Sequence, residues 1–327
     1  MNPPRVSVLI PTYNYARFLP EAIESVLAQD FQDFELLIAD DGSTDDTAEV
    51  VRPFCARDGR VRFSAHAANL GMVNNWNHCL HQARGEYIKF LFGDDKLSDP
   101  RALSKMVALL REHPSATLAA SARIFLDEDS NVLEIRRTLP DGCHNGRKIM
   151  AACVMEDANL IGEPSAVLFR KKDGGRGFDP KYRQIVDLEM WFYLLEKGDL
   201  AYTREPLCAF RQHARQQSAV NDACGLARKE HALFFTHSLA NPWMPRKARF
   251  SALFAMRRLR RKTPTAVGPE LLEAEQRLAV QLGQGWYLFH WMLYRLAVPF
   301  HNLNRSIRIR KARFISACKR KSEATHS

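Results

Sequence analysis

Two stretches of the sequence decide the fold: FELLIADDGS at residues 34–43 and EYIKFLFGDD at residues 86–95. Each is a mostly apolar run that leads into two adjacent aspartates, Asp40-Asp41 and Asp94-Asp95. Runs of this length predict strands buried on both faces, as in parallel sheets. Ligands of open α/β sheets bind beyond the carboxyl ends of the strands. The acidic pairs therefore predict a site there for a divalent cation and a ligand rich in hydroxyls and phosphates.

Strand and helix patterns alternate around these stretches over the first 115 residues. The expected strands are Val6–Ile10, Phe34–Ala39, Val61–Ser64 and Tyr87–Phe92. The expected helices are Glu21–Gln29, Thr44–Val51, Met72–Ala83 and one that starts at Asp99-Pro100 and ends near Glu112. This alternation is typical of a doubly wound, mostly parallel α/β sheet with flanking helices.

The rhythm changes after residue 115. The patterns predict a hairpin of Ala116–Leu126 and Val132–Thr138, a strand Ser165–Phe169, a helix Ile185–Lys197, and two short strands, Leu200–Thr203 and Leu207–Arg211. Past residue 220 the pattern is mainly helical with arginine clusters. We therefore expect one domain over residues 1–218, with halves of about 1–115 and 116–218, and a helical, basic C-terminal region over 219–327.

The composition is that of a globular protein, and its 327 residues include seven cysteines without a C-x-x-C spacing. This argues against a disulfide scaffold or a zinc knuckle and fits a reducing compartment. The N-terminal sequence does not resemble a signal peptide. The longest apolar stretch, Trp286–Phe300, contains His290 and Arg295 and is too short to predict a membrane span. We expect a cytoplasmic protein.

The positive charge is concentrated in the C-terminal part. Residues 1–203 carry 24 Lys and Arg against 30 Asp and Glu, whereas residues 204–327 carry 23 against 7, within an overall charge of +10. Together with the aromatic residues of Trp286–Phe300, this tail suits an anionic membrane surface on the inner face of the cytoplasmic membrane. The alternative is a helix that packs on the domain with its basic side in water. No nucleic-acid-binding module is recognisable, so nucleic acid is not an expected partner.

Several ordered motifs resemble the family 2 glycosyltransferases. The resemblance begins with VSVLIPTYNYARFLPEAIESVLAQDFQDFELLIADDGSTDDT (6–47) and NLGMVNNWNHCLHQARGEYIKFLFGDD (69–95). It continues through SAVLFR (165–170) and GFDPKYRQIVDLEMWFYLLEKGD (177–199), and it ends near EPLCAFRQHARQQS (205–218). It implies a GT-A fold and transfer of a sugar from a nucleotide-sugar to an acceptor with inversion, usually with Mg²⁺ or Mn²⁺.

The resemblance assigns the nucleotide to the loops after the first two strands. Pro11, Thr12 and Tyr13 would surround the base and ribose, with the Tyr13 ring on the face of the base. Asp41 would accept hydrogen bonds from a base or ribose group. Asn77, on a helix, either reaches the donor or steadies the edge of the sheet; these alternatives stay open.

The second acidic pair matches the metal-binding motif of the family. Negative charge develops on the departing nucleoside diphosphate, and a hard cation held by carboxylates neutralises it. Asp94 and Asp95 are the candidate ligands, and Asp94 is also a candidate contact of the nucleotide-sugar. Phe92 stands where many members have another aspartate, so which carboxylate binds metal stays open. His213, in a motif resembling R-x-H, would complete the metal shell or contact the diphosphate. Either Arg211 or Arg215 would pair with phosphate.

An inverting transfer needs a base on the acceptor side, opposite the leaving nucleotide. Asp187 matches the family carboxylate at the start of the helix D-x-x-x-W, and it is the expected base. Glu189 is the competing carboxylate, and a helix-capping role is the structural alternative for Asp187. Glu163, just before the 165–170 strand, is expected to hydrogen-bond a sugar hydroxyl of the acceptor.

These expectations combine into an inverting, metal-dependent glycosyltransferase of bacterial-type surface polysaccharide synthesis. The expected donor is a nucleoside-diphosphate sugar, with UDP favoured, and the acceptor is a saccharide or a lipid-linked saccharide. One alternative is a sugar nucleotidyltransferase, which favours a G-x-G-x-R loop after the first strand; residues 11–14 are instead PTYN. The other is a catalytically inactive nucleotide-sugar-binding relative.

Overall fold

The computed structural model describes residues 3–214, 216–239, 241–249, 251–253 and 256, together with 272–273, 275–277 and 280. The aromatic stretch at 286–300 and the arginine clusters lie outside the described residues. Among the helices that are described, none is long and apolar enough to cross a membrane.

The strands and helices follow the predicted order closely. The strands are β1 Val6–Thr12, β2 Phe34–Asp40, β3 Val61–Ala65, β4 Tyr87–Phe90, β5 Lys96–Leu97, β6 Ala116–Leu126, β7 Val132–Arg136, β8 Gly142–His144, β9 Val167–Arg170 and β10 Asp199–Arg211. The helices are α1 Leu19–Leu27, α2 Thr47–Arg57, α3 Met72–Gln82, α4 Ala102–Glu112, α5 Gly146–Glu156, α6 Val186–Leu195, α7 Gln217–Ala223 and α8 Leu226–Ser238, with a 3-10 turn, η1, at Pro164–Ala166.

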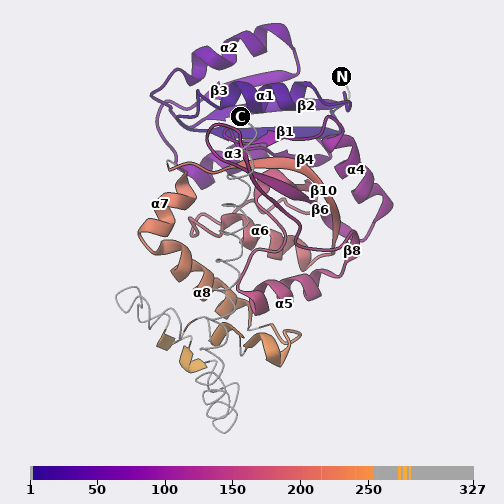
Figure 1. Cartoon of the computed structure of the whole chain (residues 1–327), viewed down its shortest axis with the longest axis vertical. Helices are drawn as coiled ribbons and strands as arrows, with labels where there is room; N and C mark the ends of the chain where they lie inside the picture. The colour runs from indigo at the N-terminus through magenta and orange to yellow at the C-terminus, as the bar shows by residue number, and fades with distance from the viewer. Residues whose placement is uncertain are drawn as a thin grey trace, which may run out of the picture.

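One sheet runs through the domain in the order β3-β2-β1-β4-β9-β6-β10-β5, with β7 beside β6 and β8 beside β10. The pairs β3/β2, β2/β1 and β1/β4 are parallel. Beyond β4 the sheet becomes mixed, because β9 is antiparallel to both β4 and β6, while β10 is parallel to β6. Figure 1 shows the parallel part at the top of the view and α5, α6 and α8 below it. This is the predicted GT-A architecture.

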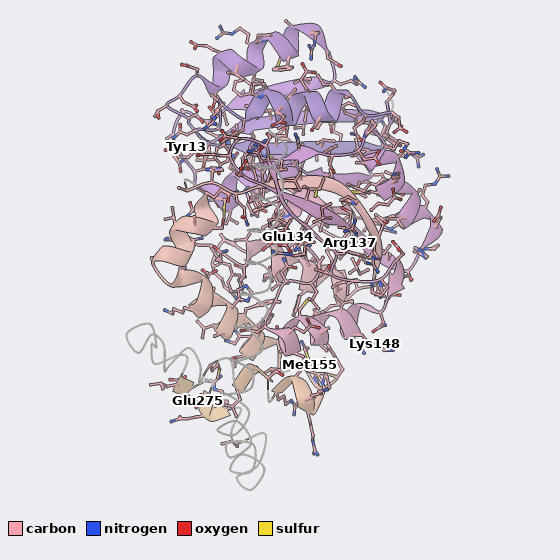
Figure 2. The ribbon with its side chains drawn as sticks, viewed as in Figure 1. Tyr13, Glu134, Arg137, Lys148, Met155 and Glu275 are labelled. Atoms are coloured by element: carbon pink, nitrogen blue, oxygen red, sulfur yellow. The ribbon has the colours of Figure 1, made fainter. Side chains whose placement is uncertain are left out.

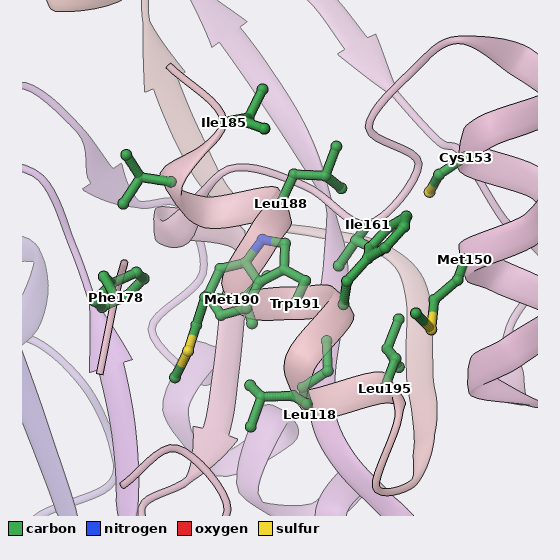
Figure 3. Packing of buried hydrophobic residues seen from close by; sticks show 14 of the residues in the cluster. Leu118, Met150, Cys153, Ile161, Phe178, Ile185, Leu188, Met190, Trp191 and Leu195 are labelled. Atoms are coloured by element: carbon green, nitrogen blue, oxygen red, sulfur yellow. The ribbon is translucent and has the colours of Figure 1, made fainter. Parts of the chain in front are cut away.

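The predicted burial of the central strands is confirmed. Every residue of β1, β2 and β4 is buried, because helices cover both faces of the sheet. One apolar cluster lies between the sheet and α1 and α4, and a second lies between the sheet and α3, α5 and α6. In the second cluster the Trp191 ring lies among Phe178, Leu188 and Ile161 (Figure 3).

Several local expectations were wrong. Pro11 and Thr12 belong to β1, paired with Ala39 and Asp40 of β2, and not to a turn after it. The two short strands expected near residue 205 form the single strand β10, because irregularities near Pro206 absorb the interruption in its pattern. The helix α5 was not predicted, although Asn145 caps it by accepting a hydrogen bond from the Lys148 amide at 3.2 Å.

The core does not end at the expected boundary of residue 218. Helices α7 and α8 begin the C-terminal region, as its helical pattern indicates. Buried residues of this region belong to the same apolar cluster as Trp191, including Phe234, Phe235, Leu239 and Met244. The described part of the C-terminal region is therefore packed on the half of the domain formed by residues 116–218.

Candidate active site

The site begins where β1 and β2 end side by side. The loop after β1 is fixed to the loop after β2: the Asn14 amide donates to Ser43 Oγ at 2.8 Å, and Asn14 Oδ1 accepts from the Thr44 amide at 2.8 Å. Asn14 has a positive φ of 58°, a conformation that asparagine tolerates better than most residues. The two loops therefore form one pre-shaped rim at the ends of β1 and β2.

The first aspartate pair organises this rim. Asp40 accepts hydrogen bonds from the Ser43 amide at 3.1 Å and from the Ser43 hydroxyl, so it caps the turn. Asp41 accepts from the Leu70 amide at 2.7 Å and the Gly71 amide at 3.0 Å. Each carboxylate oxygen has a second lone pair, so Asp41 still has acceptor capacity for a base or ribose group.

Three neighbouring residues at the end of β1 have different surroundings. Pro11 and Thr12 are buried, whereas Tyr13 is 44% exposed and points outward from the rim (Figure 2). The buried Thr12 hydroxyl makes no hydrogen bond within the described part of the chain. It lies beside Gly93, where a Cβ would come within 3.1 Å of Thr12 Oγ1. An unpaired buried hydroxyl at this edge is a candidate hydrogen-bonding group for a ligand.

Asp94 lies at the centre of the candidate metal site. Its Oδ2 is 3.1 Å from His213 Nε2 and accepts a hydrogen bond from Gln216 Nε2 at 3.1 Å. The Tyr15 ring is edge-on to the His213 ring at 5.7 Å. Burial and the neighbouring Asp94 and Asp95 carboxylates raise the pKa of Tyr15, so its hydroxyl stays protonated. The sequence places His213 119 residues from Asp94, and only the fold brings them together.

Asp95 has different surroundings from Asp94. Its Oδ1 accepts from the Arg211 amide at 2.9 Å, and its Oδ2 accepts from the Ser165 hydroxyl. Burial, together with the Asp94 charge, raises the pKa of the Asp95 carboxyl well above its usual range. Asp95 therefore joins β4, η1 and β10 from inside the protein, which favours Asp94 as the metal ligand of the pair.

Arg211 is a structural residue that the sequence left as a candidate phosphate ligand. Its buried guanidinium donates to the Asp94 carbonyl at 2.8 Å and to Ser130 Oγ at 2.8 Å, and it forms an ion pair with Glu21. Because these protein groups occupy its donors, Arg211 holds the loop of the second acidic pair in place. Arg215, the other candidate, lies outside the described residues.

The candidate base lies in the first turn of α6. Asp187 is partly exposed, and its Oδ2 accepts a hydrogen bond from Asn159 Nδ2 at 3.3 Å. Burial and the Glu163 charge raise its pKa to about 7, against opposing effects of backbone amides and Arg123. A carboxyl group with a pKa near neutrality is well matched to general-base catalysis.

The competing carboxylate on the same helix is engaged elsewhere. Glu189 forms a two-point ion pair with Arg176, at 2.8 Å from Nη1 to Oε1 and 2.6 Å from Nη2 to Oε2. A bidentate pair of this kind orients a carboxylate towards the guanidinium. The geometry therefore favours Asp187 over Glu189 as the base.

Glu163 interacts electrostatically with both acidic centres, the Asp94-Asp95 pair and Asp187. It forms an ion pair with Arg123 of β6, whose side chain is 1% exposed. The Glu163 charge raises the pKa of both Asp95 and Asp187, so it lies within electrostatic range of each centre. Sequence reasoning missed Arg123, because an arginine within the apolar strand ATLAASARIFL has no local signal for its partner.

Asn77 makes a two-point contact within the protein. Its Nδ2 donates to the Phe178 carbonyl at 2.9 Å, and its Oδ1 accepts from the Phe178 amide at 2.8 Å. Gly177 is required at this contact: it has φ of 75°, and a Cβ there would lie 2.6 Å from Asn77 Oδ1. The observed geometry favours the structural alternative for Asn77, in which it fixes the loop that leads to α6.

The residues around Asp94 are chemically compatible with a divalent cation. One carboxylate oxygen and one imidazole nitrogen converge there, and both are ligands for Mn²⁺ in proteins. The described residues contain no group of three or more His, Cys, Asp or Glu side chains arranged to hold a metal. Such a partial ligand set fits ions that take the rest of their shell from substrate phosphates and water.

Comparison with known proteins identifies the family. Residues 7–171 match the model of glycosyl transferase family 2. EpsE of Bacillus subtilis, provisionally named a glycosyltransferase, is 33% identical over 61% of this chain and 69% of that protein. The chain therefore belongs to glycosyl transferase family 2.

Solved structures share the fold at low sequence identity. The S. aureus TarS fragment 1–349 in complex with UDP-GlcNAc has a TM-score of 0.61 and 16% identity, covering 84% of this chain and 79% of that one. The mannosyltransferase PcManGT from Pyrobaculum calidifontis in complex with GDP-Man and Mn²⁺ has a TM-score of 0.56 and 18% identity, covering 93% and 88%. These likenesses establish the GT-A fold.

Proposed function

We propose that this protein is an inverting, metal-dependent glycosyltransferase. It moves a sugar from a nucleoside-diphosphate sugar to a hydroxyl of a saccharide or lipid-linked saccharide acceptor in surface polysaccharide synthesis. The observation that carries the proposal is that two acidic centres, one at Asp94-Asp95 and one at Asp187, both lie within electrostatic range of Glu163. Asp94, with His213, lies on the donor side, and Asp187, with a pKa of about 7, lies on the acceptor side.

On the acceptor side, Asp187 takes the proton of the acceptor hydroxyl as its oxygen attacks the anomeric carbon. The Asn159 amide orients the Asp187 carboxylate. The ion pair of Glu163 with Arg123 leaves Glu163 able to accept a hydrogen bond from a sugar hydroxyl. Because Glu189 is held by Arg176, one carboxylate of α6 remains free for proton transfer.

On the donor side, the rim formed by the β1 and β2 loops binds the base and ribose. Tyr13 supplies an exposed ring, Thr12 an unpaired hydroxyl, and Asp41 acceptor oxygens. Asp94 and His213 would hold Mg²⁺ or Mn²⁺, which would supply positive charge against the negative charge of the departing diphosphate. Asp95 stays a candidate ligand, although its internal hydrogen bonds favour a supporting role.

The neighbouring structures support a nucleoside-diphosphate sugar as the donor. TarS was solved with UDP-GlcNAc and PcManGT with GDP-Man, so both pyrimidine and purine nucleotides occur in proteins of this fold. We favour a UDP-sugar. The basic, aromatic C-terminal region would bring the enzyme to a lipid-linked acceptor at the inner face of the cytoplasmic membrane.

A donor panel tests the proposal. The purified full-length protein is mixed with UDP-, GDP-, dTDP- and CMP-sugars, with and without Mn²⁺, and its thermal midpoint is measured. A true donor stabilises the folded state by mass action, and we expect that stabilisation to require Mn²⁺. Product analysis by NMR then gives the anomeric configuration, which inverts if Asp187 acts as proposed.

The alternatives give different results in the same panel. An inactive nucleotide-sugar-binding relative would be stabilised by one donor but release no nucleoside diphosphate with any acceptor. A sugar nucleotidyltransferase would form a nucleotide-sugar from a sugar phosphate and a nucleoside triphosphate. Retention of configuration in the product would refute the inverting mechanism.

A further inference from the structure

The helix that carries Asp187 begins without a cap from its own sequence. Its N-cap residue is Ile185, whose side chain makes no capping hydrogen bond. An apolar residue at this position is unusual, because the backbone amides at the start of a helix need acceptors. The N-cap residue therefore does not fix the start of α6, and the groups that hold the preceding segment in place become important.

Glu230, on α8 in the C-terminal region, binds the backbone of the segment that leads into α6. Its carboxylate accepts hydrogen bonds from three consecutive backbone amides: Arg183 at 3.0 Å, Gln184 at 2.8 Å and Ile185 at 3.3 Å. Glu230 is 8% exposed. A carboxylate so deeply buried is tolerated only where it is well hydrogen-bonded. These three amides immediately precede the helix whose second residue is Asp187.

A second polar contact and an aromatic cluster hold the same segment, residues 182–185, and the helix α6 that follows it. Asn221 of α7 donates through Nδ2 to the Arg183 carbonyl at 3.1 Å and to Gln184 Oε1 at 2.8 Å. One helical turn after Glu230, the Phe234 ring packs on Phe192 of α6, with centroids 4.9 Å apart, and meets Tyr182 edge-on at 5.8 Å. Glu230 and Phe234 thus bind the base helix with the same face of α8.

We propose that Glu230 is a positioning residue for the transfer reaction, which holds the first turn of α6 so that the Asp187 carboxylate faces the acceptor. The inference rests on the proposed role of Asp187 as the base. It gives the C-terminal region, which the sequence shows only as helical and basic, a role in positioning the proposed base. Glu230 acts through the backbone of residues 183–185 and not through contact with a substrate.

The test compares full-length Glu230→Ala and Glu230→Gln with the wild type, and Lys229→Gln serves as a control that changes charge on the neighbouring residue of α8. Three readouts are measured. They are backbone amide hydrogen exchange over residues 182–190, the titration of the Asp187 carboxyl by ¹³C NMR, and steady-state kinetics. The kinetic donor is whichever of UDP-glucose, UDP-N-acetylglucosamine, GDP-mannose and dTDP-rhamnose the wild type uses fastest.

In Glu230→Ala we expect faster exchange over residues 182–190 and a shifted Asp187 titration. We expect kcat to fall roughly tenfold to a hundredfold, because a small misplacement of a reacting group has effects of this size. The KM for the donor should stay within about twofold, since the donor rim does not touch Glu230. Glu230→Gln keeps one acceptor oxygen and should lose less activity, and Lys229→Gln should match the wild type.

Two results would overturn the inference. One is unchanged exchange and Asp187 titration in Glu230→Ala; the other is faster exchange with an unaltered kcat. A fall in kcat shared by Lys229→Gln would assign the effect to general weakening of α8 and would also refute it. If the wild type turns over no donor, the proposed function fails, while the exchange and NMR readouts still decide whether Glu230 positions Asp187.

Discussion

The donor rim and the acceptor side of this site are supported in different ways. On the donor rim, Asn14, Asp40 and Asp41 are hydrogen-bonded to backbone amides of neighbouring loops. On the acceptor side, Asp187 has a raised pKa, and groups from distant parts of the chain determine its surroundings. The loops of the rim are short and held by hydrogen bonds around Asn14, Asp40 and Asp41, whereas the proposed base, Asp187, lies where burial destabilises its charge.

The largest expected effect comes from removing the base. In Asp187→Asn we expect a loss of about 10²- to 10⁴-fold in kcat, because the variant cannot take the acceptor proton. Donor affinity should be unchanged, since the donor rim is intact. The measurements are steady-state turnover and calorimetric donor binding. Glu189→Gln is the matched control on α6 and should retain most activity; a variant Asp187→Asn with wild-type turnover would reject the assignment.

The next effect separates the two aspartates of the second pair. Asp94→Ala should weaken Mn²⁺-dependent donor binding by roughly a hundredfold, because a charged metal ligand is lost. Asp95→Ala leaves the Arg211 amide and the Ser165 hydroxyl unpaired, so it should lower the free energy of unfolding by about 1–3 kcal/mol. Calorimetry with and without Mn²⁺ and urea unfolding distinguish them. The opposite pattern would make Asp95 the metal ligand.

A smaller effect is the pH dependence of the base. The pKa of Asp187 is raised from 3.8 to about 7, and only the deprotonated form accepts a proton. We therefore expect kcat to fall about tenfold per pH unit below pH 7 and to level off above it. A pH–rate profile checks this, and the residual activity of Asp187→Asn should lack that limb. A wild-type profile flat between pH 5 and 8 contradicts it.

The same pKa shift predicts a change in stability. Because the folded state holds the Asp187 proton more tightly than the unfolded state, its contribution is greatest below pH 4 and is lost as pH rises through 7. Asp187→Asn has no titrating carboxyl at this position, so it lacks the loss of stability that the wild type undergoes as pH rises. The thermal midpoint of the variant minus that of the wild type should therefore be larger at pH 8 than at pH 5. Differential scanning calorimetry at both pH values measures it; an equal difference at the two values would refute it.

The smallest functional effect is expected at Asn77. Asn77→Ala removes both hydrogen bonds to the Phe178 backbone and should lower the free energy of unfolding by about 1–3 kcal/mol. Donor affinity should remain within about twofold of the wild type, because both polar atoms of Asn77 are used inside the protein. Urea unfolding and donor calorimetry are the measurements. If Asn77→Ala weakened donor binding without lowering the free energy of unfolding, Asn77 would instead be a residue that contacts the donor.

Much of the fold was predictable because its strands are buried runs bounded by clear turns. The run 34–39 and the hairpin at 116–138 were recognised from local pattern alone, since hydrophobic periodicity and turn residues act within a few positions. The interruption at Pro206 misled the prediction for β10, because pairing with β6 carries the strand past it. The helix α5 was missed because asparagine is common in loops as well as at helix N-caps, so Asn145 does not by itself indicate that a helix begins.

The sequence by itself determined the alternation of strands and helices, the acidic pairs after strands and Asp187 at a helix start, because these depend on contiguous residues. The GT-A fold followed from the resemblance of ordered motifs to the family 2 glycosyltransferases. Only the tertiary structure decided what each carboxylate faces. It separated Asp94 from Asp95, joined Glu163 to Arg123, and brought Glu230 to the start of α6 from 45 residues away. Charge and hydrogen-bond interactions act over a few ångströms of space, whatever the distance along the chain.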